Sequence, residues 1–267
     1  SQLFIAQPSI SLAISEMEDY YGVKLFDRIS RKLYLTENGR RALQYARHII
    51  DLLDEMEQGV RDVDAMGRLK VGTSITIGTY LLPGYIKKLK QQYPALKVEA
   101  SIANSGTIEQ QILDNDIDVG IIEGVAHSPF ILSESFAGDR LVFICPAGHE
   151  FAGKTLEELS EVRNQDFILR EKGSAGREIF DGILAAQELN VRPIWQSASN
   201  QVILQGVKAG LGISILPYFL VRQDIREGEL AEFRIKDLAL NRKYSVIYHK
   251  NKFLPRSART LMELCKE

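Results

Sequence analysis

QPSISLAISEMEDYYGVKLFDRISRKLYLTENG, residues 7–39, is the stretch that decides the fold of the N-terminal part of this chain. Pro8 suits the first turn of a helix because it has no backbone N–H to leave unpaired, and the apolar residues after it recur at the spacing of one helix face. Gly22 ends this helix, two short apolar runs enclose a basic turn, and Thr36 stands at the N-cap of a second helix. A helix, a hairpin and a helix predict most of a winged helix-turn-helix. The apolar face of the first helix consists of Ile10, Ala13, Ile14 and Met17.

The other face of the first helix carries short polar side chains, which would let the helix enter a DNA major groove. The basic turn of the hairpin would contact backbone phosphates or the minor groove. For Arg28 the alternative is an ion pair with Glu18 or another carboxylate inside the motif. The candidate DNA contacts are Gln7, Pro8, Ser9, Ser11, Ser15, Arg28, Arg31 and Lys32.

This stretch resembles the N-terminal domain of LysR-type transcriptional regulators. The family's pattern Gln-Pro-x-x-Ser, Glu, Gly, Leu-Phe-x-Arg and Leu-Thr-x-x-Gly is met here by Gln7, Pro8, Ser11, Glu18, Gly22, Leu25, Phe26, Arg28, Leu35, Thr36 and Gly39. The family has another helix and most of a second one ahead of the pattern, so the resemblance implies a chain that opens within the motif, at Ser1. Leu12 departs from the family, in which many members carry a polar or basic side chain at this position.

Charge is unevenly distributed along the chain, although the formal net charge is only −2. Residues 1–48 carry seven basic against five acidic side chains, whereas residues 49–66 carry six acidic side chains against Arg61 alone. A basic tip on a more acidic body favours contact with phosphates through that tip. The alternative is a solvated surface of mixed charge.

The rest of the composition is that of a globular protein of two or three compact units, with 267 residues, 45% hydrophobic and 25% charged. The two cysteines, Cys145 and Cys265, are far apart and lack metal-ligand spacing, which argues against a disulfide scaffold or a zinc site. They suit a reducing cytosol as small buried hydrophobes. No stretch reaches transmembrane length and no signal peptide is recognisable, so we expect a cytoplasmic protein without a membrane partner.

Residues 36–66 form one long helical pattern without proline, of roughly 45 Å. Its apolar positions alternate spacings of three and four, which is typical of a heptad seam. Pairing with a second copy would cover this seam and give two DNA-binding motifs related by a two-fold axis. The alternative is an amphipathic helix packed on its own domain. The seam positions are Ala42, Tyr45, Ile49, Leu52, Met56, Val60 and Val63.

The chain after Gly67 alternates strand and helix patterns, which predicts parallel sheets covered by helices. The predicted strands are 69–73, 98–102, 119–122, 132–136, 141–145, 167–169, 194–197, 213–216, 230–233 and 244–249. The predicted helices are 80–92, 108–115, 177–189, 200–209, 218–225 and 256–266.

This half resembles the two-lobed, periplasmic-binding-protein-like (type 2) effector domain of the LysR family. The whole chain is therefore predicted to be α/β, with a partial winged helix-turn-helix at 1–36 and a linker and dimerisation helix at 37–66. Lobe I would comprise 68–145 plus 250–267, and lobe II 146–249. The chain would cross between the lobes at 146–148 and before His249, leaving a cleft and a hinge.

Small hydroxyl residues stand at the ends of predicted strands, directly before predicted helices. In open α/β sheets ligands bind at the carboxyl ends of strands, where helix N-termini offer free N–H groups and partial positive charge to an anion. Each residue alone is more simply an N-cap, but four such segments in a chain that resembles a family with a pocket there favour a binding site. The positions that match the family's pocket best are Thr73, Ser74, Thr76, Ser105 and Thr107, followed by Glu123, Ser174 and Asn200.

Two charged residues at strand ends have open interpretations. Glu123 would receive an amine, line the hinge or be a solvated carboxylate. Arg170 would pair with an anionic effector or form a surface ion pair.

No catalytic constellation is recognisable, and the four histidines have no metal spacing. We therefore expect no enzyme, no cofactor and no metal. The resemblance to the LysR family implies instead a ligand-responsive regulator that binds dyad-symmetric promoter DNA as a homodimer or homotetramer and senses a small, anionic metabolite. RNA polymerase stays open as a further partner. The alternatives are a two-lobed solute-binding protein of a transport system and, ranked last, an enzyme that uses the same cleft.

Overall fold

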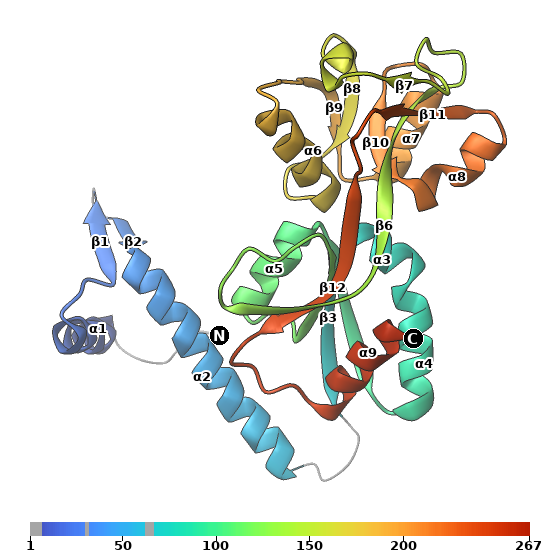
Figure 1. Ribbon diagram of the computed structural model, residues 1–267. Helices are drawn as coiled ribbons and strands as arrows, with labels where there is room; N and C mark the ends of the chain where they lie inside the picture. Colours follow the sequence, from blue (N-terminus) through green and yellow to red (C-terminus); the bar gives the residue numbers. More distant parts are fainter. Residues whose placement is uncertain (1–6, 30–31, 62–66) are drawn as a thin grey trace. The chain divides into compact units, whose positions relative to one another are not determined.

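The computed structural model describes residues 7–29, 32–61 and 67–267, and their contacts divide the chain into two compact units, Ser1–Val63 and Asp64–Glu267 (Figure 1). The chain mixes helices with parallel and antiparallel strands, as predicted for an α/β protein. None of the helices in the described ranges has the length and apolarity that a membrane span needs.

The first unit contains the predicted helix, hairpin and helix. Its elements are α1 (Gln7–Tyr21), β1 (Phe26–Ile29), β2 (Lys32–Leu35) and α2 (Glu37–Arg61), and the two strands are antiparallel. The carboxylate of Glu18 on α1 accepts the backbone N–H groups of Leu25 and Phe26, at 2.8 and 3.2 Å, and so joins helix to hairpin. Thr36 caps α2 as predicted, since its hydroxyl accepts the N–H of Gly39 at 2.9 Å.

Apolar side chains of the first unit remain exposed on both helices. Ile10 and Met17, from the predicted apolar face of α1, are exposed. On α2 the seam side chains of Tyr45, Ile49 and Met56 are exposed, Ile49 to 65%. An exposed seam is what the dimerisation hypothesis requires, while Val63 and the predicted end of the helix, residues 62–66, lie outside the described residues.

One half of the second unit, lobe I, is built around a parallel sheet. Strands β4, β3 and β5 are parallel in that order, and β12 joins β5 in antiparallel fashion. The apolar core lies between this sheet and the helices α4 and α9. The bounds are β3 Arg68–Ser74, α3 Ile75–Tyr80, α4 Leu82–Gln92, β4 Lys97–Ala103, α5 Ser105–Leu113, β5 Val119–Glu123 and α9 Arg256–Lys266.

The other half, lobe II, has a second core rich in phenylalanine, in which Phe143, Phe167, Phe180 and Phe233 are buried. Strands β8 and β9 are parallel, and β10 and β11 flank the same neighbouring strand, β6. The bounds are β6 Ile131–Pro146, β7 Thr155–Leu156, a short 3-10 helix Leu159–Val162, β8 Phe167–Arg170, α6 Ala175–Ala186, β9 Pro193–Ser197, α7 Asn200–Lys208, β10 Ser214–Pro217, α8 Tyr218–Arg226, β11 Leu230–Ile235 and β12 Asn241–His249.

Two long strands, β6 and β12, join the lobes side by side (Figure 1). The sequence predicted two separate strands where the structure has β6 alone, and this was wrong because pairing with β12 continues through Gly138 and Asp139. A Cβ on Gly138 would lie 2.7 Å from the carbonyl oxygen of Arg242, so the glycine permits the close approach. β6 pairs with β12 up to Arg140 and with the lobe II strand β10 from Leu141 onward. The chain therefore passes into lobe II several residues before the predicted crossing at 146–148.

The helix predicted at 80–92 is also divided differently. The structure has α3 directly after β3 and begins α4 at Leu82, with Pro83 in the first turn. Proline has no N–H to continue a preceding helix and is favoured at a new start. Strand β3 therefore ends at Ser74 and α3 begins at the next residue, so the side chains of α3 lie at the lobe boundary.

Candidate functional site

A cavity of about 400 Å³ lies where α3 of lobe I faces α7 and α8 of lobe II. Its walls combine aliphatic side chains with amide and hydroxyl groups, so it offers both apolar surface and hydrogen-bonding groups. The lining residues are Ile75, Thr79, Tyr80, Ala198, Ser199, Asn200, Gln201, Leu204, Leu216 and Leu220.

The lobe I candidates at the end of β3 are buried. Thr73, Ser74 and Thr76 are each almost inaccessible, Ser74 to 1%. Ser74 is the N-cap of α3, yet its hydroxyl makes no capping bond and has no hydrogen-bond partner within residues 7–29, 32–61 and 67–267. A buried hydroxyl without a partner costs on the order of 1–3 kcal/mol, so this oxygen is a group for which a ligand or an ordered water would provide the missing bond.

The second lobe I segment is already engaged in local hydrogen bonds. Asn104 caps α5 by accepting the N–H of Thr107 at 2.9 Å, and the hydroxyl of Ser105 donates to the carbonyl of Glu123 at 3.0 Å. Ser105 is buried and Thr107 is exposed. In this segment the capping interpretation holds for Asn104, which the sequence analysis did not single out.

Among the residues of the cavity wall, Asn200 of lobe II forms a hydrogen bond with lobe I. Asn200 accepts a hydrogen bond from the guanidinium of Arg170 at 2.8 Å and donates to the hydroxyl of Thr76 at 3.5 Å. Arg170 also forms two hydrogen bonds with Glu171, at 2.9 and 3.1 Å, so this cation is neutralised within the protein. Ser174 is buried and caps α6 through the N–H of Arg177.

Glu123 is not a solvated carboxylate, because the structure buries it in an ion-pair network at the crossing strands. A carboxylate oxygen of Glu123 lies 3.0 Å from a guanidinium nitrogen of Arg242, at an angle that does not give a hydrogen bond. The side chain of Glu123 is 5% exposed and that of Arg242 is 3% exposed. Arg242 also pairs with Asp139 at 2.5 Å, and Asp139 accepts the hydroxyl of Tyr244 at 2.8 Å. Burial opposes the charge of Arg242, but Glu123 and Asp139 raise its pKa.

Arg242 and Asp139 could not be singled out from the sequence, because both lie outside the predicted strands, where charged residues ordinarily face solvent. Burial, and then the hydrogen bond to Asp139, also raise the pKa of Tyr244. The network ties both crossing strands to the end of β5, where the carbonyl of Glu123 accepts Ser105. It therefore joins the strands that connect the lobes to the start of α5.

In the first unit, the predicted DNA contacts lie on exposed surface. Gln7, Pro8, Ser9, Ser11 and Ser15 are exposed on α1, with Gln7 and Ser11 within 3.4 Å of each other. Arg28 and Lys32 are exposed on the hairpin, and Arg31 lies outside the described residues.

The alternative role of Arg28 as the partner of Glu18 is wrong. Glu18 pairs with Lys24 at 2.5 Å, and this bond, with the backbone N–H of Leu25, lowers the pKa of Glu18.

Comparison with known proteins decides the family. Residues 64–267 match the LysR substrate binding domain, and residues 1–40 match the bacterial regulatory helix-turn-helix protein of the lysR family. The chain belongs to the LysR family of transcriptional regulators. Among its relatives is the HTH-type transcriptional regulator YeiE of Escherichia coli, 34% identical over 98% of this chain and 89% of that protein. The HTH-type transcriptional activator CmpR of Synechocystis is 29% identical over 98% of this chain and 86% of that protein.

Solved structures of LysR proteins have the same fold. The regulatory domain of Synechocystis CcmR, in complex with 2-PG, aligns with a TM-score of 0.68 at 25% identity over 75% of this chain and 96% of that one. A full-length variant of OxyR from Pseudomonas aeruginosa aligns with a TM-score of 0.67 at 20% identity, over 98% of this chain and 86% of that one. These matches confirm the two-lobed fold, and with the family models they support a ligand-responsive LysR-type regulator rather than a transport receptor.

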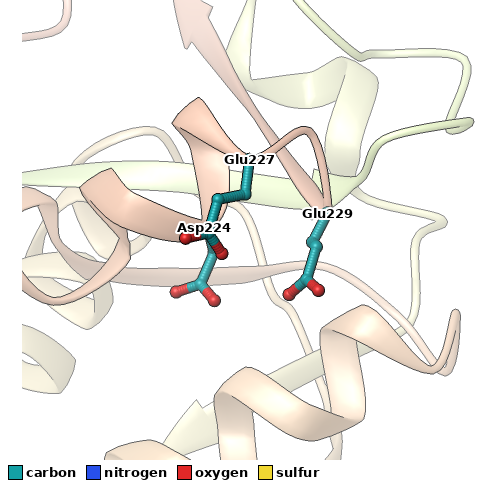
Figure 2. A group of neighbouring side chains, drawn as sticks. All are labelled: Asp224, Glu227 and Glu229. Carbon is teal, nitrogen blue, oxygen red and sulfur yellow. The ribbon is translucent and has the colours of Figure 1, made fainter.

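Two further groups of this regulator have chemistry to consider. Asp224, Glu227 and Glu229 bring their carboxylates together at the end of α8, the one group of metal-ligating side chains found in the described part of the chain (Figure 2). Lys208 pairs with Asp224 and, at 2.5 Å, with Glu229, so a cation of the protein itself offsets part of the negative charge of the cluster. Cys145 and Cys265 are buried, as predicted, and burial raises their pKa values to about 11 and about 12.

Proposed function

We propose that this regulator binds a small anionic metabolite between its lobes, with Ser74, Thr76 and Asn200 among the contacts. The observation that carries the proposal is the buried hydroxyl of Ser74, which has no hydrogen-bond partner among the described residues and directly precedes Ile75, a residue of the cavity wall. Helix α7 begins at Asn200, in the cavity wall, and its N-terminus carries partial positive charge there, which favours an anion. Thr73, Ser105, Thr107, Glu123 and Ser174 would shape the site rather than all contact the ligand.

The test is thermal unfolding of the full chain with sulfate, phosphate, citrate or glutamate at fixed ionic strength. A ligand at a hundred times its dissociation constant stabilises the protein by roughly 2.7 kcal/mol, a clear rise in Tm. We expect Ser74→Ala to lose most of that rise, and Ser133→Ala, on the exposed part of β6, to keep it. A panel without any stabilising anion, or equal stabilisation of both variants, would overturn the proposal.

We also propose that α1 and the hairpin contact DNA through the residues named above, and that two copies pair through the exposed seam of α2 to bind a dyad-symmetric site. Arg28 and Lys32 would bind phosphates, because their side chains are exposed on the hairpin. We assign the chain no catalytic step, since the named relatives are transcriptional regulators. A transcriptional regulator that binds DNA would work in the cytoplasm.

The salt dependence of DNA binding tests this second proposal. The slope of log affinity against log salt is negative, and each lost phosphate contact makes it about 0.9 less steep. Lys32→Ala removes one such contact from each copy of the dimer, so the slope should change by about 1.8 on any duplex, whereas Lys87→Ala, on α4 of the second unit, should leave it unchanged. An unchanged slope in Lys32→Ala would remove the hairpin from the interface.

A further inference from the structure

His127 lies between the lobes, held on one side and facing a carboxylate on the other. Glu109 of α5 accepts the backbone N–H groups of His127 and Ser128 at 2.8 and 2.7 Å, and its second oxygen is 3.1 Å from Nδ1 of the imidazole. Nε2 of the same ring lies 3.8 Å from the carboxylate of Glu178 on α6. Glu109 and His127 belong to lobe I and Glu178 to lobe II, so the ring spans the boundary.

The lobes touch directly beside this histidine. The N–H of Gly106, at the start of α5, donates to the carbonyl of Gly173 in lobe II at 3.0 Å. A Cβ added to Gly124 would be 3.0 Å from the Cβ of Ala175. The Gly106–Gly173 hydrogen bond therefore forms only when the lobes are together and reports their closure at one backbone amide.

Both charged groups that face the imidazole are carboxylates. The hydrogen bond to Glu109 and the negative charges of Glu109 and Glu178 raise the pKa of His127, although partial burial opposes this. The neighbouring cation on α6, Arg177, is directed elsewhere, to Asp181 at 2.7 Å and to the carbonyl of Arg170. A protonated ring thus meets negative charge from each lobe.

We propose that His127 is a proton-operated latch between the lobes, whose protonation favours the closed cleft and with it the binding of the effector. The link to effector binding rests on the function proposed above, whereas the latch itself requires no ligand. Opening removes Glu178 from the ring and leaves Glu109 in place, so the closed form holds the proton more tightly. Closure is accordingly favoured below the ordinary pKa of histidine and is lost as pH rises through the raised value.

Hydrogen exchange of the ligand-free full chain tests the latch. The protection factor compares the exchange rate of the Gly106 amide with that of an unprotected amide at the same pH, so it removes the intrinsic pH dependence of exchange and reports the opening of the lobes. Because the ring is 60% exposed, the ion pair is weak, and we expect this factor to fall about two- to fivefold from about pH 6 to about pH 8.5. The Asp118 amide, which donates to Lys70 within lobe I, should not follow this trend.

Two variants separate the latch from general stability. His127→Gln and Glu178→Gln should each make the Gly106 protection factor independent of pH, while His149→Gln, within lobe II, should retain the wild-type fall. A pH-dependent fall in Glu178→Gln, or a flat wild-type profile, would overturn the latch. Either result would leave the anion site to its own test with Ser74→Ala, so the two proposals fail separately.

Discussion

Removing Arg242 should destabilise the second unit more than removing any surface cation. Its guanidinium, 3% exposed, lies between the side chains of Glu123 and Asp139, which are 5% and 12% exposed, so Arg242→Met would leave two largely buried carboxylates without their cation. Breaking a buried pair in this way costs about 3–5 kcal/mol. For a unit of this size that corresponds to a fall in Tm of roughly 6–20 °C.

Thermal unfolding followed by circular dichroism, supported by urea titration, measures this effect. Arg68→Met is the matched control, because Arg68 pairs with Glu99 on exposed surface, where an ion pair contributes about 0–1 kcal/mol. Adding Glu123→Gln to Arg242→Met should recover part of the loss, since one of the unpaired charges is gone. A loss below about 1 kcal/mol in Arg242→Met would refute the reasoning, because the network would then contribute no more than a surface pair.

Three further predictions concern other parts of the chain. In Gly39→Ala the new Cβ would lie 1.9 Å from the carbonyl oxygen of Leu25, so the first unit should lose about 1–3 kcal/mol of stability while the Tm of the second unit stays the same. Burial raises the pKa values of Cys145 and Cys265 to about 11 and about 12, so both thiols should be unreactive toward a disulfide reagent at about pH 8. They should react once guanidinium has unfolded the protein. Reaction in the folded protein would contradict their burial. The double variant Ile49→Lys/Met56→Lys should have a lower mass in light scattering, close to that of the monomer, whereas Asn38→Lys at the exposed start of α2 should keep the wild-type mass. An unchanged mass in the double variant would exclude the seam as the dimer contact.

Local sequence signals predicted the elements of this fold well. Thr36 caps α2, and β3, β4, β5 and α9 agree with their predicted positions within a residue or two. These elements combine a clear apolar period with a turn or cap residue at the end. The errors occurred where tertiary contact decides, as along β6, whose polar middle continues as a strand because β12 pairs with it.

The candidate site could be predicted only in part. Strand ends followed by hydroxyl residues identified Ser74 and Asn200, which the structure places at the lobe boundary. The sequence could not distinguish the free hydroxyl of Ser74 from that of Ser105, which donates to Glu123, because the difference lies in a partner distant in sequence. Arg242 and His127 escaped notice for the same reason, since their partners come from other elements.

A ligand-responsive regulator couples anion binding between its lobes to DNA binding, and reciprocal titration measures this coupling. A duplex selected by this chain from a random pool would be titrated by fluorescence anisotropy with and without the anion that raises the Tm, and the anion would be titrated with and without the duplex. The account predicts that each ligand changes the affinity of the other by the same factor, typically about 5–150-fold in allosteric proteins, and that Ser74→Ala loses this coupling. An anion that binds in the cleft and leaves the DNA affinity unchanged would contradict it.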